Sequence, residues 1–183
     1  SIITQEGNTL NGSEASEILI GGDGHDIIYA DGGDDVLFAG LGDDILNGGE
    51  GNDTLIGGPG NDIMTGGEGR DTFVWKAGDD AGGALDTIND FTLGQNGDVL
   101  DLSDLLSGEN HTAESLDAYF NISYDNASDT STISVNPDGG ASFNATQTIV
   151  LSGVDLTAGG TLQTDQAILD VLINNGNLVT DGG

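Results

Sequence analysis

The chain has 183 residues, and 32 aspartates and glutamates against 2 lysines and arginines give it a formal net charge of −30. This charge excludes nucleic-acid binding and insertion into an anionic membrane, and the absence of cysteine excludes disulfides and thiolate metal sites. Hydrophobic residues nevertheless make up 36% of the chain, which argues against a wholly disordered acidic polypeptide. We therefore expect cations to neutralise the acids when the chain folds.

The first eleven residues lack the basic, apolar and small-residue sections of a signal peptide. Either the protein is intracellular, or it is exported by another route, or the chain is part of a longer one. No apolar run in the sequence is long enough for a transmembrane helix. Leu10 continues backwards the repeat pattern that begins at residue 12, and this predicts an N-terminal cap strand within residues 1–11.

A nine-residue phrase, G-G-x-G-x-D-x-U-x with U apolar, recurs from residue 12 to residue 74. Its eighth position is apolar in every copy, from Leu19 to Phe73. Glycine at this density excludes a helix, and a six-residue turn followed by a three-residue strand fits every copy. Two copies then form one turn of a parallel solenoid, in which residue i stacks on residue i+18 at about the 4.8 Å spacing of neighbouring strands. We predict an all-β fold whose parallel β-roll spans residues 12–80.

The sixth position of the phrase is acidic in every copy, first as Glu17 and then as six aspartates. Stacking puts three of them on each edge of the roll: Asp26, Asp44 and Asp62 on one, and Asp35, Asp53 and Asp71 on the other. Bare carboxylates held this close would repel one another and oppose folding. A hard dication resolves the conflict, because Ca²⁺ accepts about six to eight oxygens from carboxylates and backbone carbonyls, and glycine lets a turn carry its carbonyls inward.

These copies resemble the RTX (repeats-in-toxin) calcium-binding β-roll. The resemblance implies that each ion lies between loops one solenoid turn apart. One loop supplies the carbonyls of positions 1 and 3 and the carboxylate of position 6, and the other supplies the carbonyls of positions 2 and 4 and its own carboxylate. It also implies about four to six Ca²⁺ ions in the roll, with weaker sites at Glu17/Asp35 and Asp62/Asp80, whose outer loops lack most of the glycines.

The expected metal ligands are the six aspartates, Asp80 and the glycines of the loops. These glycines are Gly21, Gly22, Gly24, Gly33, Gly40, Gly42, Gly48, Gly49, Gly51, Gly57, Gly58, Gly60, Gly66, Gly67 and Gly69. Asp31 stands where the phrase has its second glycine. The repeat frame continues forwards as far as Gly78 and Asp80, which would hold the fourth and sixth positions of a further copy.

Ordinary β patterning follows the glycine phrase and predicts a β-rich, sandwich-like C-terminal subdomain over residues 81–183. Two short helices are expected within it, over residues 113–120 and over residues 166–175. Thr164 or Asp165 can cap the second helix. One face of that helix is apolar, as expected of core residues: Ile168, Leu169, Leu172 and Ile173.

The stretch DTFVWKAGDDAGGALDTINDFTLGQNGDVLDLSDLL resembles the segment that follows the roll in the secretion-target region of large bacterial RTX adhesins. The likeness continues through TQTIVLSGVDL and NNGNLVTD. It implies that type I secretion machinery recognises residues 81–183 and exports the chain, C-terminus first and without an N-terminal signal peptide. A secreted or cell-surface location follows, with the remainder of the parent adhesin as the other partner. Four acids could hold one further Ca²⁺, or they could be solvated acids at strand ends: Asp86, Asp90, Asp98 and Asp101.

Catalysis within these residues is not expected. The sequence has neither an HExxH zinc motif nor a GxSxG nucleophile elbow, and its two histidines, His25 and His111, lie in outward or polar positions. Two alternatives to a secretion target stay open: a carbohydrate- or peptide-binding module of the adhesin, and the C-terminal tail of an RTX hydrolase. Ligand binding by the isolated domain would favour the first, and export of a fused passenger would favour the secretion target.

The two outer faces of the roll differ in their seventh- and ninth-position residues. One face carries a broad apolar strip: Ile18, Ile20, Val36, Phe38, Thr54, Ile56, Thr72 and Val74. A monomer seldom leaves such a strip in water, so we expect the C-terminal subdomain, through its helix at residues 166–175, or a partner to cover it. Since β-branched residues also favour strands wherever they point, that simpler explanation stays open.

Overall fold

The computed structural model describes residues 7–80, 82–106, 116, 118–137 and 145–180, which form β-strands and the helix α1. In chain order the elements are β1 (Thr9–Ser13), β2 (Ile18–Asp23), β3 (Ile27–Asp31), β4 (Val36–Leu41), β5 (Ile45–Glu50), β6 (Thr54–Ile56), β7 (Ile63–Glu68), β8 (Thr72–Val74), β9 (Ala84–Ile88), β10 (Val99–Asp101), β11 (Phe120–Asp125), β12 (Thr130–Val135), β13 (Gln147–Ser152), α1 (Asp165–Asn175) and β14 (Leu178–Val179).

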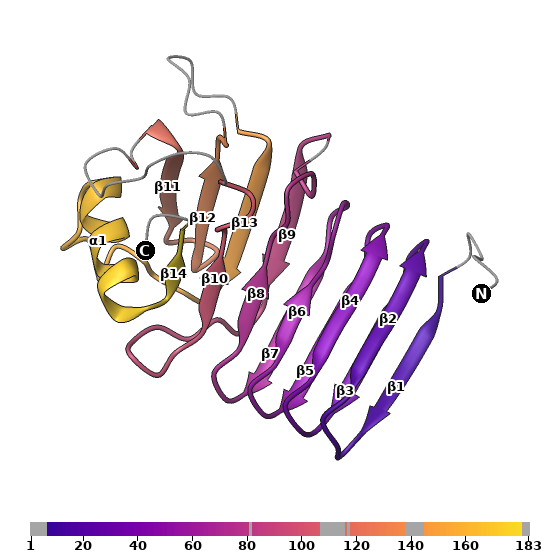
Figure 1. Ribbon diagram of the computed structural model, residues 1–183. Coiled ribbons are helices and arrows are strands. Elements are labelled where there is room, and N and C mark those ends of the chain that lie inside the picture. Colours follow the sequence, from indigo (N-terminus) through magenta and orange to yellow (C-terminus); the bar gives the residue numbers. More distant parts are fainter. Residues whose placement is uncertain (1–6, 81, 107–115, 117, 138–144, 181–183) are drawn as a thin grey trace.

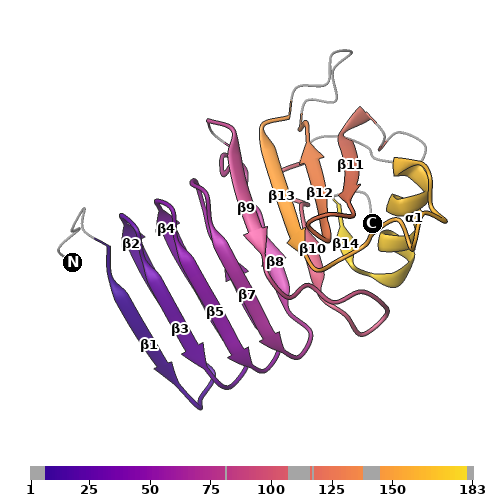
Figure 2. The same cartoon turned by 180° about the vertical axis from the view of Figure 1, so that it is seen from behind.

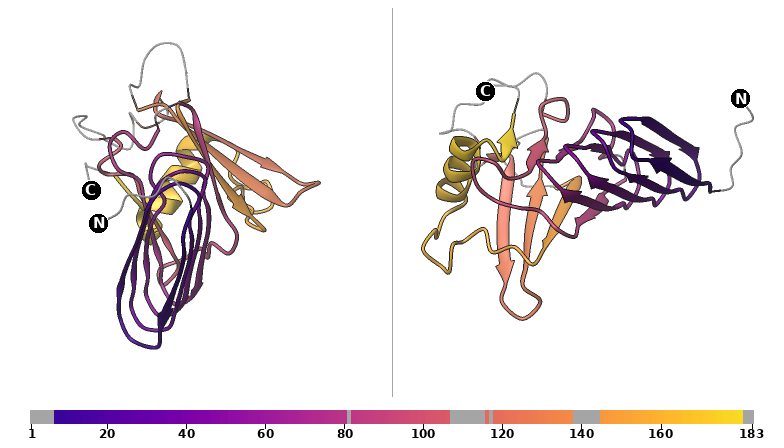
Figure 3. Two further views of the ribbon diagram at one scale, coloured as in Figure 1. Left: turned by 90° about the vertical axis from the view of Figure 1, so that its right-hand side faces the viewer. Right: turned by 90° about the horizontal axis from the view of Figure 1, so that it is seen from below.

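Successive strands of the first part of the chain lie in two different sheets. The eight-stranded sheet has the order β1-β3-β5-β7-β9-β13-β12-β11, and the six-stranded sheet has the order β14-β10-β8-β6-β4-β2. Figures 1 and 2 show the turns side by side from the N-terminal end towards β9. Because each strand is followed by one in the opposite sheet, the chain winds as a flattened coil, seen end-on in the left view of Figure 3.

The strand register of the roll follows the repeat. Ile27 of β3 pairs with Ile45 of β5, and Ile45 pairs with Ile63 of β7, all in parallel. Each pairing joins residues one 18-residue turn apart, and β2, β4 and β6 pair in the same way. The predicted all-β fold with a parallel β-roll is confirmed.

A single row of eighth-position side chains from each sheet fills the core of the roll. These side chains are buried because alternate residues of a strand point to opposite faces. Those with 0 to 1% exposure are Ile28, Leu37, Leu46, Leu55, Met64 and Phe73. Full burial of such a side chain contributes about 1.5–3 kcal/mol. The roll thus has a thin core for its length, and most of its remaining residues lie in turns or on its surface.

The glycines at the second and fourth positions let the turns stack at strand spacing. Gly51 has φ of 137°, a conformation that side chains rarely adopt, and a Cβ there would overlap the carbonyl oxygen of Gly33 in the preceding turn. Asp31, which replaces a second-position glycine, has φ of 70°. This lies in the left-handed region that aspartate tolerates better than most residues, so the turn keeps its course at this departure from the phrase.

The register changes after β8. In the eight-stranded sheet, Ile63 of β7 pairs with Thr87 of β9, and in the six-stranded sheet Thr72 of β8 pairs with Val99 of β10. These steps are longer than the turn of the roll, because a loop precedes β9 and another precedes β10. The expectation that the nonapeptide frame continues through Gly78 and Asp80 is therefore wrong.

Both sheets continue across the boundary predicted between residues 80 and 81. In the eight-stranded sheet, β13 pairs in parallel with β9, and β12 and β11 then add as antiparallel strands. In the six-stranded sheet, β10 pairs with β8, and β14 pairs with β10. Backbone hydrogen bonds therefore join the roll to the C-terminal part along two sheets, as Figure 1 shows around β9 and β10.

The helix α1 forms where the sequence predicts it. Thr164 caps it by accepting a hydrogen bond from the N–H of Ala167, and Gly176 ends it with φ of 75°. Ile168, Leu169 and Leu172 are buried, as expected of its apolar face. Half of the other predicted helix, over residues 113–120, lies outside the described residues, and its last residue, Phe120, begins β11 instead. No described helix has the length and apolar character needed to cross a membrane.

The C-terminal part does not cover the outer face of the six-stranded sheet at its N-terminal end. Ile18 and Ile20 of β2 are 68% and 64% exposed, and Phe38 of β4 is 38% exposed. The helix α1 instead packs near β14 and β11, at the opposite end of the molecule. The expectation that this helix covers the strip is wrong, because the C-terminal part extends the two sheets end to end and does not fold back over them.

Candidate metal sites

The sixth-position aspartates line the two edges of the roll and are almost completely buried. Their side chains have 0 to 1% exposure, although aspartate is normally a surface residue. The structure places three of them one above another on each edge, as the repeat predicts. We call the set Asp26, Asp44 and Asp62 the first ladder, and the set Asp35, Asp53 and Asp71 the second ladder.

A regular hydrogen bond joins each aspartate of a ladder, here called a rung, to the next one. The backbone N–H of Asp26 donates to Oδ1 of Asp44 at 2.7 Å, and that of Asp44 donates to Oδ1 of Asp62 at 2.9 Å. On the second ladder, the N–H of Asp53 donates to Oδ1 of Asp71 at 2.9 Å. Each carboxylate is thereby oriented by the turn before it, and its Oδ1 is satisfied.

The second carboxylate oxygen of each rung has no partner. In all six ladder aspartates, Oδ2 is buried and accepts no hydrogen bond. Burying a carboxylate oxygen without a hydrogen bond or a counterion is costly, and native structures rarely leave one so. Six such atoms in regular array therefore fit a cationic ligand, and Ca²⁺ would supply the positive charge that these oxygens need when it is bound.

Burial also raises the pKa values of five ladder carboxyls, those of Asp35, Asp44, Asp53, Asp62 and Asp71. It is the largest cause that raises the pKa of Asp62 to about 8 and the pKa values of Asp44 and Asp71 to about 6. The N–H donor from the preceding turn lowers them by a smaller amount, and neighbouring carboxylates such as Asp86 beside Asp62 raise them further. Without a cation, the ionised form of Asp62 is therefore unfavourable at neutral pH.

The donor set of the loops favours a hard cation that accepts backbone oxygens. Among the described residues, no three acidic or histidine side chains gather into one cluster, so a cation in these loops must take several ligands from the backbone. The loops supply such oxygens at close spacing: the carbonyl oxygens of Gly22 and Gly24 lie where a Cβ on Gly40 and Gly42 would be. Carboxylate and carbonyl oxygens at flexible geometry are the ligands that Ca²⁺ prefers.

A second set of polar contacts runs along the outside of each edge, between fifth-position side chains. Asn52 donates through its backbone N and through Nδ2 to Oδ1 of Asp34, at 2.8 and 3.2 Å, and the N–H of Arg70 donates to Oδ1 of Asn52 at 3.0 Å. His25 belongs to the matching set on the first ladder's edge, where its Nδ1 accepts from the N–H of Asp43. The structure thus gives His25 a role in stacking the turns.

Asp86 and Asp98, not Asp80, stand next after the ladders. The N–H of Asp62 donates to Oδ1 of Asp86 at 2.8 Å, and the N–H of Asp71 donates to Oδ1 of Asp98 at 3.0 Å. Asp80 lies apart and accepts a hydrogen bond from Oγ1 of Thr146 at 2.6 Å. The expected pairing of Asp62 with Asp80 is wrong, because the loop before β9 shifts the register.

The other C-terminal acids do not form one shared site. Asp90 accepts from the N–H groups of Gly66 and Gly67, on the edge of the second ladder, where Asp98 also lies. Asp86 lies on the edge of the first ladder. The expectation of one further ion shared by Asp86, Asp90 and Asp98 is therefore wrong in its grouping, because Asp86 lies on one edge of the roll and Asp90 and Asp98 lie on the other.

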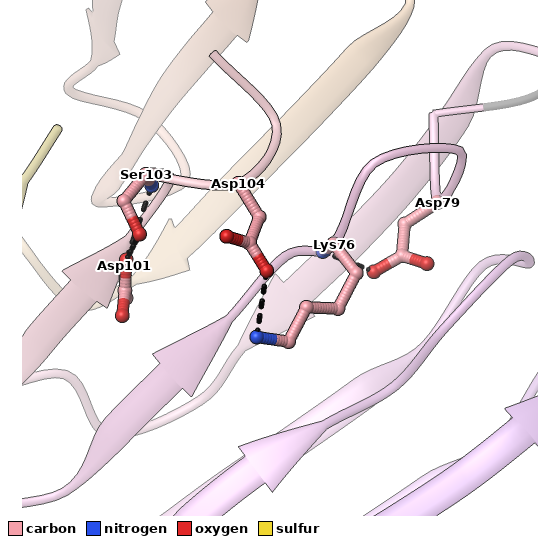
Figure 4. A network of polar contacts seen from close by, with 5 residues as sticks. All are labelled: Lys76, Asp79, Asp101, Ser103 and Asp104. Atoms are coloured by element: carbon pink, nitrogen blue, oxygen red, sulfur yellow. Dashed lines mark hydrogen bonds and ion pairs between the residues drawn. The ribbon is translucent and has the colours of Figure 1, made fainter. Parts of the chain in front are cut away.

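Asp101 belongs to a polar network of its own beyond the roll. Figure 4 shows that Asp101 accepts from Ser103, while Nζ of Lys76 contacts Asp104 at 2.8 Å. The backbone N–H of Lys76 donates to Asp79 at 2.6 Å. The carboxylates of Asp79, Asp101 and Asp104 thus find their donors in local turns and in the Lys76 ammonium group. The Lys76–Asp104 pair is about half exposed, so it adds little to stability.

Residues 11–46 and 38–73 match the family model of the RTX calcium-binding nonapeptide repeat (4 copies). Residues 11–73 therefore carry RTX calcium-binding repeats. These repeats contain both ladders, so the buried, unpartnered carboxylate oxygens lie in a segment whose family binds Ca²⁺. None of the curated proteins compared with the chain matches it.

One solved structure supports the fold. The chain is similar to the AlgE6R3 subunit of the Azotobacter vinelandii mannuronan C5-epimerase, with a TM-score of 0.50 and 23% identity over 97% of this chain and 81% of that one. The AlgE6R2 subunit of the same epimerase gives a TM-score of 0.43 and 24% identity over 94% of this chain and 92% of that one. The first likeness agrees with the β-roll seen here.

Proposed function

We propose that the chain is a calcium-dependent folding and type I secretion-target region of an exported bacterial RTX adhesin. In this proposal Ca²⁺ binds between the stacked loops and drives folding of the roll, and residues 81–183 carry the export signal. The observation that carries the calcium part is the buried, unpartnered Oδ2 of every ladder aspartate. The secretion part is supported by the resemblance of the segments after the roll to the secretion-target region of RTX adhesins.

Calcium-dependent folding suits a protein that leaves the cell as an unfolded chain. With a net charge of −30, the metal-free chain repels itself and resists compaction. About four to six Ca²⁺ ions would supply about +8 to +12 charges, and the free energy of their binding adds directly to folding because the loops exist only in the folded roll. The chain would therefore stay extended where Ca²⁺ is scarce and fold where it is abundant.

An export assay tests the secretion part. A reporter protein fused before residue 1 is expressed in a bacterium that carries type I secretion machinery, and the reporter is measured in the medium. We expect export with the full chain and loss of export when residues 81–183 are deleted. The matched control is Asp53→Asn in the full chain, which disturbs a ladder but leaves residues 81–183 unchanged and should be exported at the same level. Equal export with and without residues 81–183 would contradict this part.

A ligand-binding module is the second candidate, and a cavity favours it. A cavity of about 370 Å³ lies between the end of β11 and the start of α1, with Tyr124, Asn126, Thr157 and Gln163 among its lining residues. An aromatic ring beside amide and hydroxyl groups suits a sugar, and the AlgE6R3 subunit belongs to a mannuronan C5-epimerase. Calorimetric titration with neutral oligosaccharides tests it: binding that Tyr124→Ala removes would favour the module, and no heat would exclude it for those sugars.

A further inference from the structure

The ends of the two ladders differ from their interiors in how the carboxylates are satisfied. An ionised carboxylate has two oxygens and about four lone pairs that can accept hydrogen bonds or bind a cation. In the interior, for example at Asp44 and Asp53, Oδ1 accepts one N–H and Oδ2 accepts none. An oxygen left in this state depends on a cation.

At the C-terminal end of the first ladder, protein donors fill both oxygens of Asp86. Its Oδ1 accepts the N–H of Asp62, as an interior rung would. Its Oδ2 accepts Nε1–H of Trp75 at 2.7 Å and Nε2–H of Gln147 at 2.8 Å. Asp86, Trp75 and Gln147 are all buried, with exposures of 1%, 2% and 0%. This carboxylate therefore has donors at the oxygen where each interior rung has none.

The C-terminal end of the second ladder is closed in the same way by other residues. Oδ1 of Asp98 accepts the N–H of Asp71, and its Oδ2 accepts both N–H and Oγ1–H of Thr92, at 2.7 and 3.0 Å. Nδ2 of Asn177 donates to the backbone oxygen of Asp98 at 2.7 Å and ties this turn to the residue before β14. Two unrelated sets of donors thus give the same result on the two edges.

The N-terminal end of the first ladder shows a third case. Asn8 lies 18 residues before Asp26, so it holds the sixth position of a preceding turn. Its Nδ2 donates to Oδ1 of Asp26 at 3.0 Å and to the carbonyl oxygen of Gly21 at 3.3 Å. A carboxylate oxygen and a first-position carbonyl are the groups that a loop offers to a cation, and here an amide contacts both.

We propose that hydrogen-bond donors of the protein, in place of Ca²⁺, close the C-terminal ladder ends, so that the joint between the roll and the C-terminal part forms without metal. At the N-terminal end of the first ladder, Asn8 stands in for one ligand carboxylate, while Oδ2 of Asp26 has no hydrogen-bond partner. The joint is defined as Trp75, Asp86, Thr92, Asp98 and Gln147. This inference rests on the proposed calcium-dependent folding of the interior rungs. Neutral donors do not leave when a chelator removes Ca²⁺, so the joint keeps its contacts while the interior rungs lose theirs.

The only tryptophan of the chain is the probe for this proposal, because Trp75 is part of the joint. The full chain is titrated with CaCl₂ from a solution in EDTA, and Trp75 fluorescence and far-ultraviolet circular dichroism are recorded together. We expect a blue-shifted emission, protected from acrylamide quenching, already in EDTA and little changed by Ca²⁺, while the β signal rises. A red-shifted, quenchable emission in EDTA that shifts together with the β signal would overturn the proposal. A β signal that ignores Ca²⁺ would instead contradict the proposed function.

Two variants sharpen the test. Gln147→Met removes one donor to Asp86 while keeping bulk, and we expect its Trp75 emission to become red-shifted in EDTA and to recover in Ca²⁺. Gln163→Met, at an exposed glutamine, is the matched control and should behave as the parent chain. An emission of Gln147→Met that equals the parent's in EDTA would contradict a role for this donor.

Asn8→Asp tests the N-terminal end independently of the joint. The substitution exchanges an amide donor for a carboxylate at a sixth position, so we expect calorimetric titration of the full chain to give about one additional Ca²⁺ per chain. Asn8→Ala is the control, since it removes the donor without adding a ligand and should add no ion. An unchanged stoichiometry for Asn8→Asp would overturn the proposal at this end.

Discussion

In the roll, burial raises the pKa of Asp62 to about 8 and that of Asp44 to about 6, whereas in the C-terminal part hydrogen bonds hold the pKa values of Asp125 and Asp155 below their ordinary value. These two carboxylates accept from neighbouring N–H and hydroxyl groups of their own turns: Asp155 accepts from the N–H of Gly159, and Asp125 accepts from the N–H of Ala127. Satisfied by these donors, they need no metal. The same residue type therefore makes one region depend on cations and leaves the other independent of them.

Metal removal should separate the two regions most strongly. In EDTA we expect amide hydrogens of residues 12–74 to exchange at near-unfolded rates, because the ladder carboxylates lose their counterions, while residues 147–175 stay protected. Hydrogen exchange followed by mass spectrometry measures both regions in one sample. Mg²⁺ serves as the control ion and should restore little protection, since it demands a rigid octahedral site. Equal protection of the roll in EDTA and in Ca²⁺ would show that the roll does not depend on Ca²⁺.

Adding a methyl group to a turn should have the next largest effect, on thermal stability. Gly51→Ala forces a side chain into a φ of 137° and into the carbonyl oxygen of Gly33, whereas Gly78→Ala meets a comparable φ of 100° in open space. Backbone strain costs about 1–3 kcal/mol in both variants, and the overlap with the Gly33 carbonyl adds to it only at Gly51. We therefore expect Gly51→Ala to lower the melting temperature in Ca²⁺ clearly more than Gly78→Ala. Thermal denaturation of both variants gives the comparison. Equal losses would mean that the close stacking of turns contributes little.

Loss of an interior ladder aspartate should reduce Ca²⁺ binding more than loss of a terminal acid. Asp53→Ala removes a buried carboxylate with a neighbour on each side, so we expect about one to two fewer Ca²⁺ ions and a less cooperative titration. Glu17→Ala is the matched terminal variant, because the Glu17 carboxylate accepts from the backbone N and from Oγ of Ser13 in its own loop. Isothermal titration calorimetry measures both. Similar, negligible effects of the two substitutions would contradict the assignment of the ladders.

The smallest effect should be a response of the metal-free roll to pH. The raised pKa values mean that the folded roll binds protons more tightly than the unfolded chain, so its stability should increase as the pH falls from about 8 towards about 4. We expect partial recovery of the roll's β signal in EDTA at pH 5 relative to pH 8, measured by circular dichroism. In the same window the apparent affinity for Ca²⁺ should decrease, because protons compete for Asp62 and Asp71.

The repeat allowed the roll to be predicted almost completely, since one spacing determines pairing, burial and stacking together. Leu46 is buried and Asp44 lies above Asp26 for the same reason, namely the period of the phrase. Beyond β8 the steps between stacked acids become 24 and 27 residues, so no fixed spacing could place Asp86 or Asp98. Their donors come from distant segments, with Gln147 lying 61 residues beyond Asp86.

Two errors came from local patterns whose meaning depends on the global arrangement. The frame through Asp80 failed because two matching positions do not make a repeat once a loop intervenes. The helix α1 does not cover the apolar strip, because Ile18 and Ile20 are largely exposed in this chain, as the preference of β-branched residues for strands also allows. Asn8 was missed although its position, 18 residues before Asp26, is visible in the sequence.

The contacts between successive ladder aspartates are the same in every turn, and this limits which insertions or deletions of residues the roll can accept. Duplication or deletion of 18 residues within β2 to β8 would reproduce the contacts of both ladders, because each ladder aspartate meets the next through the same atoms. A change of nine residues would instead exchange the two edges and bring the wrong acid, Asp86 or Asp98, to the end of each ladder. The genetic unit of variation in this roll should therefore be the pair of nonapeptides, and related chains should differ by whole pairs.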